Sequence, residues 1–208
     1  MSDGILQEVE KYYTNKVISH GATPQGVDWN GTESQEKRFA QLLKITENEK
    51  LDNYTLLDYG CGFGSLLTYL NKNDSQINYI GYDISEEMLK NALEQHNNDA
   101  TWLNKLEPNL KADYVVASGL FNVKLAESYP SWEKYIFKTL DQINSIAVKG
   151  FAFNILTSYS DKEFMKEYLY YASPEYYFQH CKINYAKNIS LIHDYDLFEF
   201  TILIKKQT

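Results

Sequence analysis

The 208-residue sequence has little cysteine, and it has no excess of positive charge. Its two cysteines, Cys61 and Cys181, lack the spacing of metal ligands, so we expect neither a metal site nor a disulfide framework. Two free thiols fit a reducing, cytoplasmic location. The net charge of −8 disfavours a nucleic-acid partner. No apolar run approaches the ~20 residues of a membrane span, and the first residues lack the pattern of a signal peptide.

Arginine is also nearly absent, since Arg38 is the single arginine among 20 basic residues. We find no repeat and no linker rich in proline or serine. Because 208 residues suit one domain better than two, we expect a single unit. In it, residues 1–50 would form an N-terminal helical cap on a core of residues 51–208.

Short apolar runs alternate with amphipathic stretches from about residue 55 onward. This alternation predicts βαβ units, and hence a mostly parallel sheet with helices on both faces. The strands expected in this part are 55–60, 78–83, 100–104, 112–121 and 146–156. The helices expected with them are 65–73, 85–96, 132–143, 161–172 and 175–181, and two more near 3–18 and 33–48 belong to the cap.

The last two strand-like runs, 188–195 and 197–205, almost touch. They leave no room for a crossover helix, so they must pair as a hairpin, which makes one strand antiparallel. The fold class predicted is therefore α/β: a Rossmann-like, doubly wound, seven-stranded sheet with one antiparallel C-terminal strand.

The stretch LLDYGCGFGSLL, residues 56–67, places three glycines after an acidic residue at the end of the first strand. In an open α/β sheet, ligands bind at the carboxyl ends of the strands where the strand order reverses, and glycine lets the backbone approach them. Asp83 ends the next strand, where a carboxylate accepts both hydroxyls of a ribose. A nucleoside-bearing cofactor is the first hypothesis.

The glycine spacing and Asp58 discriminate between two classes of cofactor. A dinucleotide site has G-x-G-x-x-G, whereas this turn reads D-x-G-x-G-x-G. Asp58 would repel a pyrophosphate but suits a cationic ligand such as a sulfonium that carries an amino group. With the terminal hairpin, the motif resembles the class I S-adenosylmethionine-dependent methyltransferases over residues 52–205. The alternatives are an NAD-linked Rossmann enzyme and a methyltransferase-like protein that holds the cofactor or a partner without catalysis.

The resemblance implies S-adenosylmethionine as cofactor and S-adenosylhomocysteine as product. It places Asp58, Gly60 and Gly62 at the methionine part, Asp83 at the ribose, and Ile84 and Met88 near the adenine. Many members have an aspartate for the adenine amino group after the third strand, where this chain has TWLNKLEP. Asn104 or a backbone group must then serve. Cys61 and Ser118 complete the expected cofactor residues.

The end of the fourth strand, ASGLFNV at 117–123, lacks the [DNS]-P-P-[YFW] motif of base-modifying relatives. We therefore expect transfer to an oxygen or nitrogen of a small molecule, either an anionic metabolite or a glycan precursor, by a monomer or homodimer. An alcohol acceptor needs a general base, whereas a carboxylate or phosphate does not. The candidate acceptor-binding residues are Trp29, Gln35, Arg38, Phe121, Asn122 and Asn154, and the candidate catalytic residues are Tyr13, His20 and His193.

Four of these candidates also have a structural interpretation. The lone arginine suggests bidentate binding of an anion, but Arg38 could instead pair with a glutamate on its own helix. Phe121 could be an ordinary core residue, Asn122 a turn residue, and His193 a structural histidine near the hairpin turn.

Overall fold

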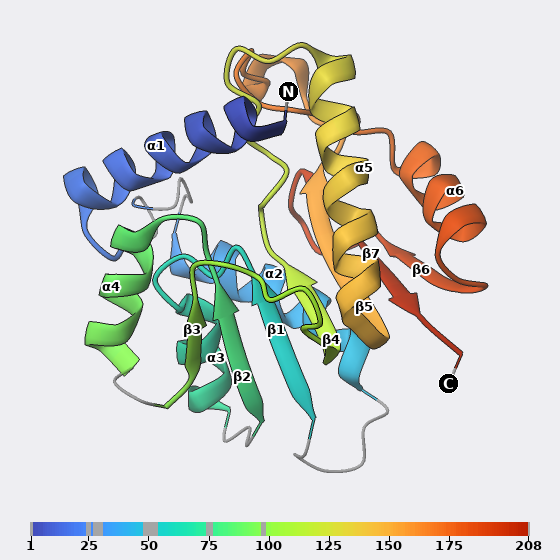
Figure 1. Cartoon of the computed structure of the whole chain (residues 1–208). Helices are drawn as coiled ribbons and strands as arrows, with labels where there is room; N and C mark the ends of the chain where they lie inside the picture. The colour runs from blue at the N-terminus through green and yellow to red at the C-terminus, as the bar shows by residue number, and fades with distance from the viewer. Residues whose placement is uncertain are drawn as a thin grey trace.

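A seven-stranded sheet in the order β3-β2-β1-β4-β5-β7-β6 forms the centre of the molecule (Figure 1). The computed structural model describes residues 2–23, 26, 31–47, 54–73, 77–96 and 99–207. The strands are β1 (Thr55–Tyr59), β2 (Asn78–Tyr82), β3 (Thr101–Leu103), β4 (Ala112–Ala117), β5 (Ala147–Leu156), β6 (Asn188–Ile192) and β7 (Glu199–Lys205).

Helices cover both faces of this sheet (Figure 1). They are α1 (Ser2–His20), α2 (Thr32–Leu43), α3 (Ser65–Lys72), α4 (Glu86–His96), α5 (Tyr129–Ile146) and α6 (Pro174–Asn184), with short 3-10 turns η2 (Lys44–Thr46) and η3 (Lys162–Phe164). No helix in the described ranges is long and apolar enough to cross a membrane.

The pairing of the strands confirms the predicted fold class. The strands β1 to β5 run parallel, and β7 lies antiparallel to both of its neighbours, β5 and β6. The chain runs outward from β1 through β2 to β3 and then returns to β4 on the other side of β1. The strand order therefore reverses between β1 and β4, and the glycine turn follows β1 at that point.

Alternating side chains of the strands fill two apolar layers. On one face, α5 and α6 pack on residues such as Leu57, Phe153 and Ile202. On the other face, α2 and α3 pack on residues such as Leu56 and Leu203. This alternation also decides where polar strand residues point, because Asn154 and Glu199 share the α2 face with Leu203.

The helix α1 lies beyond the carboxyl ends of β1 and β2, next to α4 (Figure 1). Val17 packs with Phe63 and Met88, and the hydroxyl groups of Thr14 and Ser85 lie 2.7 Å apart. This N-terminal helix thus covers the edge of the sheet where the glycine turn lies.

The helix predicted at 161–172 is wrong. After η3 the chain forms a turn at residues 167–168 and no further helix up to residue 172, and isolated bridges join Val123 to Leu169 and Thr157 to Ala172. The backbone N–H of Tyr170 donates to Asn122 O, and that of Ala172 donates to Leu156 O. These bonds to the loop after β4 and to the end of β5 replace the helical bonds, so long-range contacts override the local helical pattern. We call residues 157–172 the roof segment.

Candidate functional site

The glycine turn is fixed to the neighbouring strand by two backbone hydrogen bonds. The N–H groups of Gly60 and Cys61 both donate to Tyr82 O, at 2.8 and 3.0 Å. Gly60 has φ +84°, and a Cβ there would lie 2.9 Å from Leu120 Cδ1. The left-handed backbone favours glycine, and the missing Cβ leaves room for the tip of the Leu120 side chain. The turn therefore brings its backbone close to Leu120, in the loop after β4.

The third glycine serves packing rather than the cavity. Gly64 precedes α3 with φ +84°, and a Cβ there would lie within 3 Å of the Trp102 and His96 rings. Both rings belong to the side of the sheet that α3 covers, away from the ligand edge. The three glycines of the motif thus do not share one function.

A cavity, which we call the first cavity, opens above this turn, between α1 and the ends of β1, β2 and β4. Eight of the nine residues expected at a cofactor line it: Asp58, Gly60, Cys61, Gly62, Asp83, Ile84, Met88 and Ser118. Asn104 does not, because its exposed side chain donates to Glu86 instead, at 3.3 Å.

Asp83 occupies the wall of the first cavity at the end of β2. Its Oδ2 accepts the N–H of Gly62 and its Oδ1 that of Ser85, both at 2.9 Å. Burial nevertheless raises the pKa of Asp83 to about 6, and the negative charge of Glu10 on α1 adds to the increase. The carboxylate keeps lone pairs for two more donors, because it can accept about four hydrogen bonds.

Asp58 lies deeper in the same wall and is 3% exposed. Its Oδ2 accepts a hydrogen bond of 2.7 Å from the Tyr79 hydroxyl. Burial raises its pKa to about 7, against the lowering effect of that bond. Across the described ranges, no lysine or arginine forms an ion pair with Asp58 or Asp83. The first cavity therefore has two buried carboxyl groups whose charge the protein does not neutralise.

A second cavity of about 760 Å³ lies beside the first, beneath the roof segment and the β6–β7 turn. Tyr13 and Gly119 line both cavities, so the two spaces meet there. Two of the candidate acceptor-binding residues, Arg38 and Asn122, line the second cavity together with the candidate catalytic residue His193. Its other charged and aromatic lining residues are Phe164, Lys166, Tyr168, Tyr171, Asp194, Asp196, Phe198 and Glu199.

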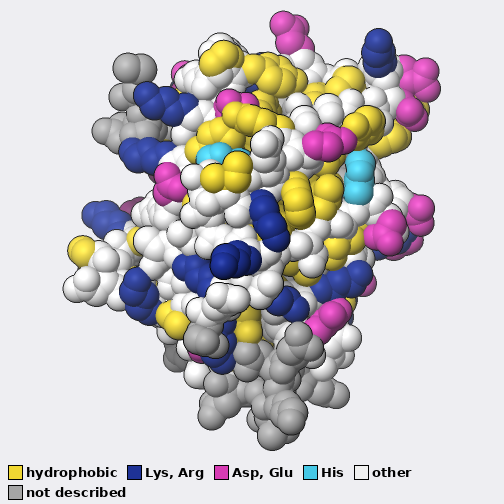
Figure 2. All heavy atoms as spheres, turned by 90° about the vertical axis from the view of Figure 1, so that its right-hand side faces the viewer, with side chains coloured by type: hydrophobic (Ala, Val, Ile, Leu, Met, Phe, Trp, Pro, Cys, Tyr) yellow, Lys and Arg dark blue, Asp and Glu magenta, His cyan; other side chains and the backbone are white. Residues whose placement is uncertain are grey.

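Two aromatic side chains of this cavity also reach the surface. Phe164 is 60% exposed and Phe198 is 43% exposed, with ring centroids 6.1 Å apart. Figure 2 shows hydrophobic side chains gathered in the upper half of the face over α6 and the β6–β7 edge. The second cavity thus has apolar surface at its rim as well as charged groups in its wall.

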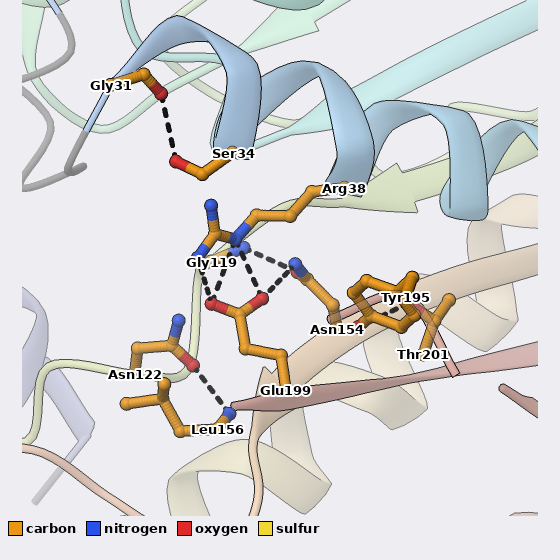
Figure 3. A network of polar contacts seen from close by, with 10 residues as sticks. All are labelled: Gly31, Ser34, Arg38, Gly119, Asn122, Asn154, Leu156, Tyr195, Glu199 and Thr201. Atoms are coloured by element: carbon orange, nitrogen blue, oxygen red, sulfur yellow. Dashed lines mark hydrogen bonds and ion pairs between the residues drawn. The ribbon is translucent and has the colours of Figure 1, made fainter. Parts of the chain in front are cut away.

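A buried network of polar side chains supports the junction of the two cavities (Figure 3). Arg38 Nε donates to both carboxylate oxygens of Glu199, and Arg38 Nη2 donates to Glu199 Oε1 at 2.6 Å. Asn154 Nδ2 donates to Glu199 Oε2, and Asn154 Oδ1 accepts the Gly119 N–H, both at 2.7 Å. The network therefore holds Gly119, whose φ is +69°, between the cavities.

The network changes the interpretation of Arg38 and Asn154. The glutamate that pairs with Arg38 is on β7, not on its own helix as the structural alternative proposed. Asn154 is fully buried with both ends of its amide bound, and it lines neither cavity. Asn154 therefore supports Gly119 directly, and Arg38 supports it through Glu199 and Asn154.

The remaining candidates lie in different places. Gln35 lines the first cavity rather than the second. Phe121 is fully buried, lies edge-on to Phe153 and lines neither cavity, as its interpretation as a core residue expects. His20 ends α1, is exposed and lines neither cavity. Trp29 falls outside the described residues.

Sequence reasoning missed Glu199 and Tyr79. Glu199 interrupts the apolar run LFEFTILIK, and a carboxylate in a buried strand needs a cation. The single arginine was the obvious partner, but nothing in the sequence places residues 161 positions apart together. Tyr79 gave no signal, because tyrosine in a strand is ordinary.

Comparison with known proteins places the chain in a family. Residues 57–147 match a protein family described as a methyltransferase domain. The chain is 43% identical over 157 residues to Rv1506c of Mycobacterium tuberculosis (strain ATCC 25618 / H37Rv), whose name describes it as a methyltransferase. This match covers 74% of the chain and 95% of that relative. The chain belongs to the methyltransferase family.

Solved methyltransferase structures share its fold. A DhpI-SAM-HEP complex has a TM-score of 0.68 at 11% identity, covering 99% of each chain. The plantazolicin methyltransferase BpumL in complex with SAH has a TM-score of 0.60 at 15% identity, covering 100% of each chain. The resemblance of the glycine motif to the class I S-adenosylmethionine-dependent methyltransferases is thus confirmed at the level of family and fold.

Proposed function

We propose that this methyltransferase binds S-adenosylmethionine in the first cavity and methylates an oxygen or nitrogen of a small molecule in the second. The observation that carries the proposal is the meeting of the two cavities at Tyr13 and Gly119. A donor on one side of this junction and an acceptor on the other have their reacting atoms adjacent. Positioning of this kind is a large part of what a transferase contributes to catalysis.

The residues of the first cavity fit S-adenosylmethionine. The cofactor has a positively charged sulfur and an ammonium group, and the wall offers Asp58 and Asp83 without a paired cation. Ser118 Oγ is buried there and has no hydrogen-bond partner within the described chain. A pyrophosphate would meet the same two carboxyl groups and be repelled. The donor set thus supports a cationic nucleoside over NAD.

Each wall residue then has a role that follows from its contacts. Asp83 keeps its bonds from Gly62 and Ser85 and accepts the ribose hydroxyls with its remaining lone pairs. Ile84 and the buried Met88 pack against the adenine. Asp58 and the backbone at Gly60 and Gly62 face the methionine part.

When bound, the cofactor supplies an activated methyl group on sulfur, so the chain must position the acceptor and, for an alcohol, accept its proton. His193 lines the second cavity and is the candidate base for that step. Tyr13 lies at the junction and is the candidate for orienting the acceptor. A carboxylate or phosphate acceptor would need no base.

The wall of the second cavity supports a polar acceptor such as a glycan precursor. The guanidinium of Arg38 is already held by Glu199, which weakens the case for an arginine that clamps an anion. Lys166 and His193 face the cavity together with Asp194 and Asp196, so both signs of charge are present. The aromatic rings of Phe164 and Phe198 offer flat surfaces for an apolar or sugar ring.

Calorimetry with S-adenosylhomocysteine and with NAD tests the first cavity. We expect binding of the former only, and binding of NAD alone would overturn the proposal. Transfer from radiolabelled S-adenosylmethionine to a panel of polar acceptors then tests the second cavity. Binding without turnover across the panel would favour a protein that holds the cofactor without catalysis.

A variant that blocks the second cavity tests the proposed roles of the two cavities separately. Leu169→Trp fills the second cavity from the roof segment, so we expect it to abolish transfer and leave S-adenosylhomocysteine affinity unchanged. Ile183→Trp adds the same bulk at a position on α6 that is 72% exposed and lines neither cavity, and it should retain transfer. Full activity of Leu169→Trp would place the acceptor elsewhere.

A further inference from the structure

The Tyr79 side chain reaches Asp58 from beneath the first cavity. Tyr79 pairs with Leu56 in the register of β1 and β2, and Asp58 pairs with Gly81. Tyr79 and Asp58 are therefore diagonal neighbours on one face of the two strands, and the tyrosine hydroxyl donates its 2.7 Å hydrogen bond along that diagonal. Gly81 cannot have a side chain, because a Cβ would lie 2.5 Å from the Trp102 ring. The diagonal placement of Tyr79 and Asp58 is thus set by the register of β1 and β2.

This contact is separate from the residues that touch the cavity. Tyr79 is 3% exposed, packs in the layer between the sheet and α3, and does not line the first cavity. Asp58 does line it. A hydrogen bond from a tyrosine favours the ionised form of a carboxyl group, while burial favours the neutral form. The charge of Asp58 is therefore a balance between the two.

We propose that Tyr79 is a positioning residue of this methyltransferase, whose hydroxyl favours the ionised form of Asp58 and directs its carboxylate at the positive charge of the bound cofactor. The inference rests on the proposed function, because it assigns the first cavity to S-adenosylmethionine. Tyr79 acts only through Asp58. Its loss should change how cofactor affinity depends on pH, which a tyrosine that merely fills the core would not do.

The charged groups near Asp58 shift its ionisation in a known direction. Asp83 adds negative charge and opposes its ionisation, and Glu10 of α1 acts on Asp83 in the same way. The α2 and α3 residues of the cavity wall, Gln35, Phe39, Ser65 and Leu66, are uncharged. The titratable groups in the wall besides the two aspartates are Cys61 of the glycine turn, Tyr13 of α1, Tyr59 of β1, Tyr82 of β2 and Tyr135 of α5.

The direction in which cofactor affinity changes with pH follows from the positive charge of S-adenosylmethionine. As pH falls through the pKa of Asp58, about 7, the carboxyl group becomes neutral and affinity for S-adenosylmethionine should weaken. Without the Tyr79 hydroxyl that pKa rises, so the weakening begins at a higher pH. An upward shift of about one unit takes the ionised fraction at pH 7 from about one half to about one eleventh, a roughly fivefold loss of affinity.

The experiment measures the dissociation constant of S-adenosylmethionine from pH 5.5 to 8.5 for the native protein and Tyr79→Phe. We expect the midpoint of the variant to move to higher pH. In the Asp58→Asn background, Tyr79→Phe should have no further effect on the midpoint. Tyr170→Phe is the matched control, because it removes a hydrogen-bonded hydroxyl from another tyrosine that is 3% exposed and lines neither cavity.

A second measurement keeps the test independent of cofactor binding. A ¹³C NMR titration of the Asp58 carboxyl carbon, assigned with Asp58→Asn, should give a higher pKa in cofactor-free Tyr79→Phe than in the native protein. An unmoved pKa and an unmoved midpoint would overturn the role of Tyr79. If neither S-adenosylmethionine nor S-adenosylhomocysteine binds the native protein at any pH, the proposed function fails instead.

Discussion

Asp58 and Glu199 are both buried carboxyl groups on the sheet face that α2 and α3 cover, yet their surroundings are opposite. Glu199 is 1% exposed and is neutralised by Arg38, with Asn154 donating as well. Asp58 is 3% exposed, and among the described residues the side chain bonded to it is the tyrosine Tyr79, through its hydroxyl. A buried charge costs free energy unless it is paired. The paired carboxylate belongs to the framework, and the unpaired one is available for a cation from outside.

Removing Glu199 should have the largest effect on stability. Glu199→Ala leaves the buried guanidinium of Arg38 without its carboxylate, so we expect the free energy of unfolding to fall by about 3–5 kcal/mol. Urea unfolding followed by circular dichroism measures it. As a control, Glu33→Ala removes an acid whose side chain is 87% exposed and should change stability by less than about 0.5 kcal/mol. Equal effects of the two variants would mean that the pair is not a framework element.

Asp58 should respond in the opposite direction. Asp58→Asn removes an unneutralised buried carboxylate, and its amide oxygen can still accept the bond from Tyr79. We expect cofactor-free protein at pH 7.5 to become more stable by roughly 1–3 kcal/mol, and its affinity for S-adenosylmethionine to fall. Urea unfolding and calorimetry measure the two quantities. A loss of stability like that of Glu199→Ala would contradict the difference between the two sites.

The same comparison predicts how stability depends on pH. The folded pKa values of Asp58 and Asp83, about 7 and 6, lie above the ordinary value of 3.8, so the folded state binds more protons in between. Cofactor-free stability should therefore fall as pH rises from about 4 to 7, by at most about 1.4 kcal/mol per pH unit for each group. Unfolding curves at intervals of half a pH unit test this. The Asp58→Asn, Asp83→Asn double variant should lose the slope, and an unchanged slope would assign it to other groups.

Asn104 should show the smallest effect. It lies outside the first cavity and bonds to Glu86 on the surface. We expect Asn104→Ala to change the dissociation constant of S-adenosylhomocysteine by less than about twofold, because an exposed hydrogen bond contributes little. Calorimetry beside Asp83→Ala, which removes the proposed ribose contact, sets the scale. A tenfold loss in Asn104→Ala would restore the adenine contact that the resemblance implies.

The predictable part of this molecule is the part that local pattern determines. The alternation of strands and helices gave the sheet, and the short link between the last two strands gave the reversed β7. The motif around Asp58 placed eight of nine cofactor candidates in one cavity, because neighbouring parallel strands end at the same edge.

The predictions that failed concern residues whose partners lie far away in the sequence. The run at 161–172 has a helical pattern, but its backbone forms hydrogen bonds with the loop after β4 and with the end of β5. Arg38 has the features of a ligand clamp until the fold brings Glu199 to it. Such contacts are decided by which segments the topology brings together, and no spacing rule within one segment contains that information.

The position of β7 has a consequence for synthesis. The last strand of the chain lies between β5 and β6 in the sheet, and Glu199 at its start supports Gly119 through Asn154. A nascent chain that lacks residues 199–205 has two unpaired strand edges and an unsupported junction, although the glycine turn has long been made. We therefore expect a ribosome-bound chain to form the first cavity, the proposed site of the methyl donor, before the second cavity, the proposed site of the acceptor.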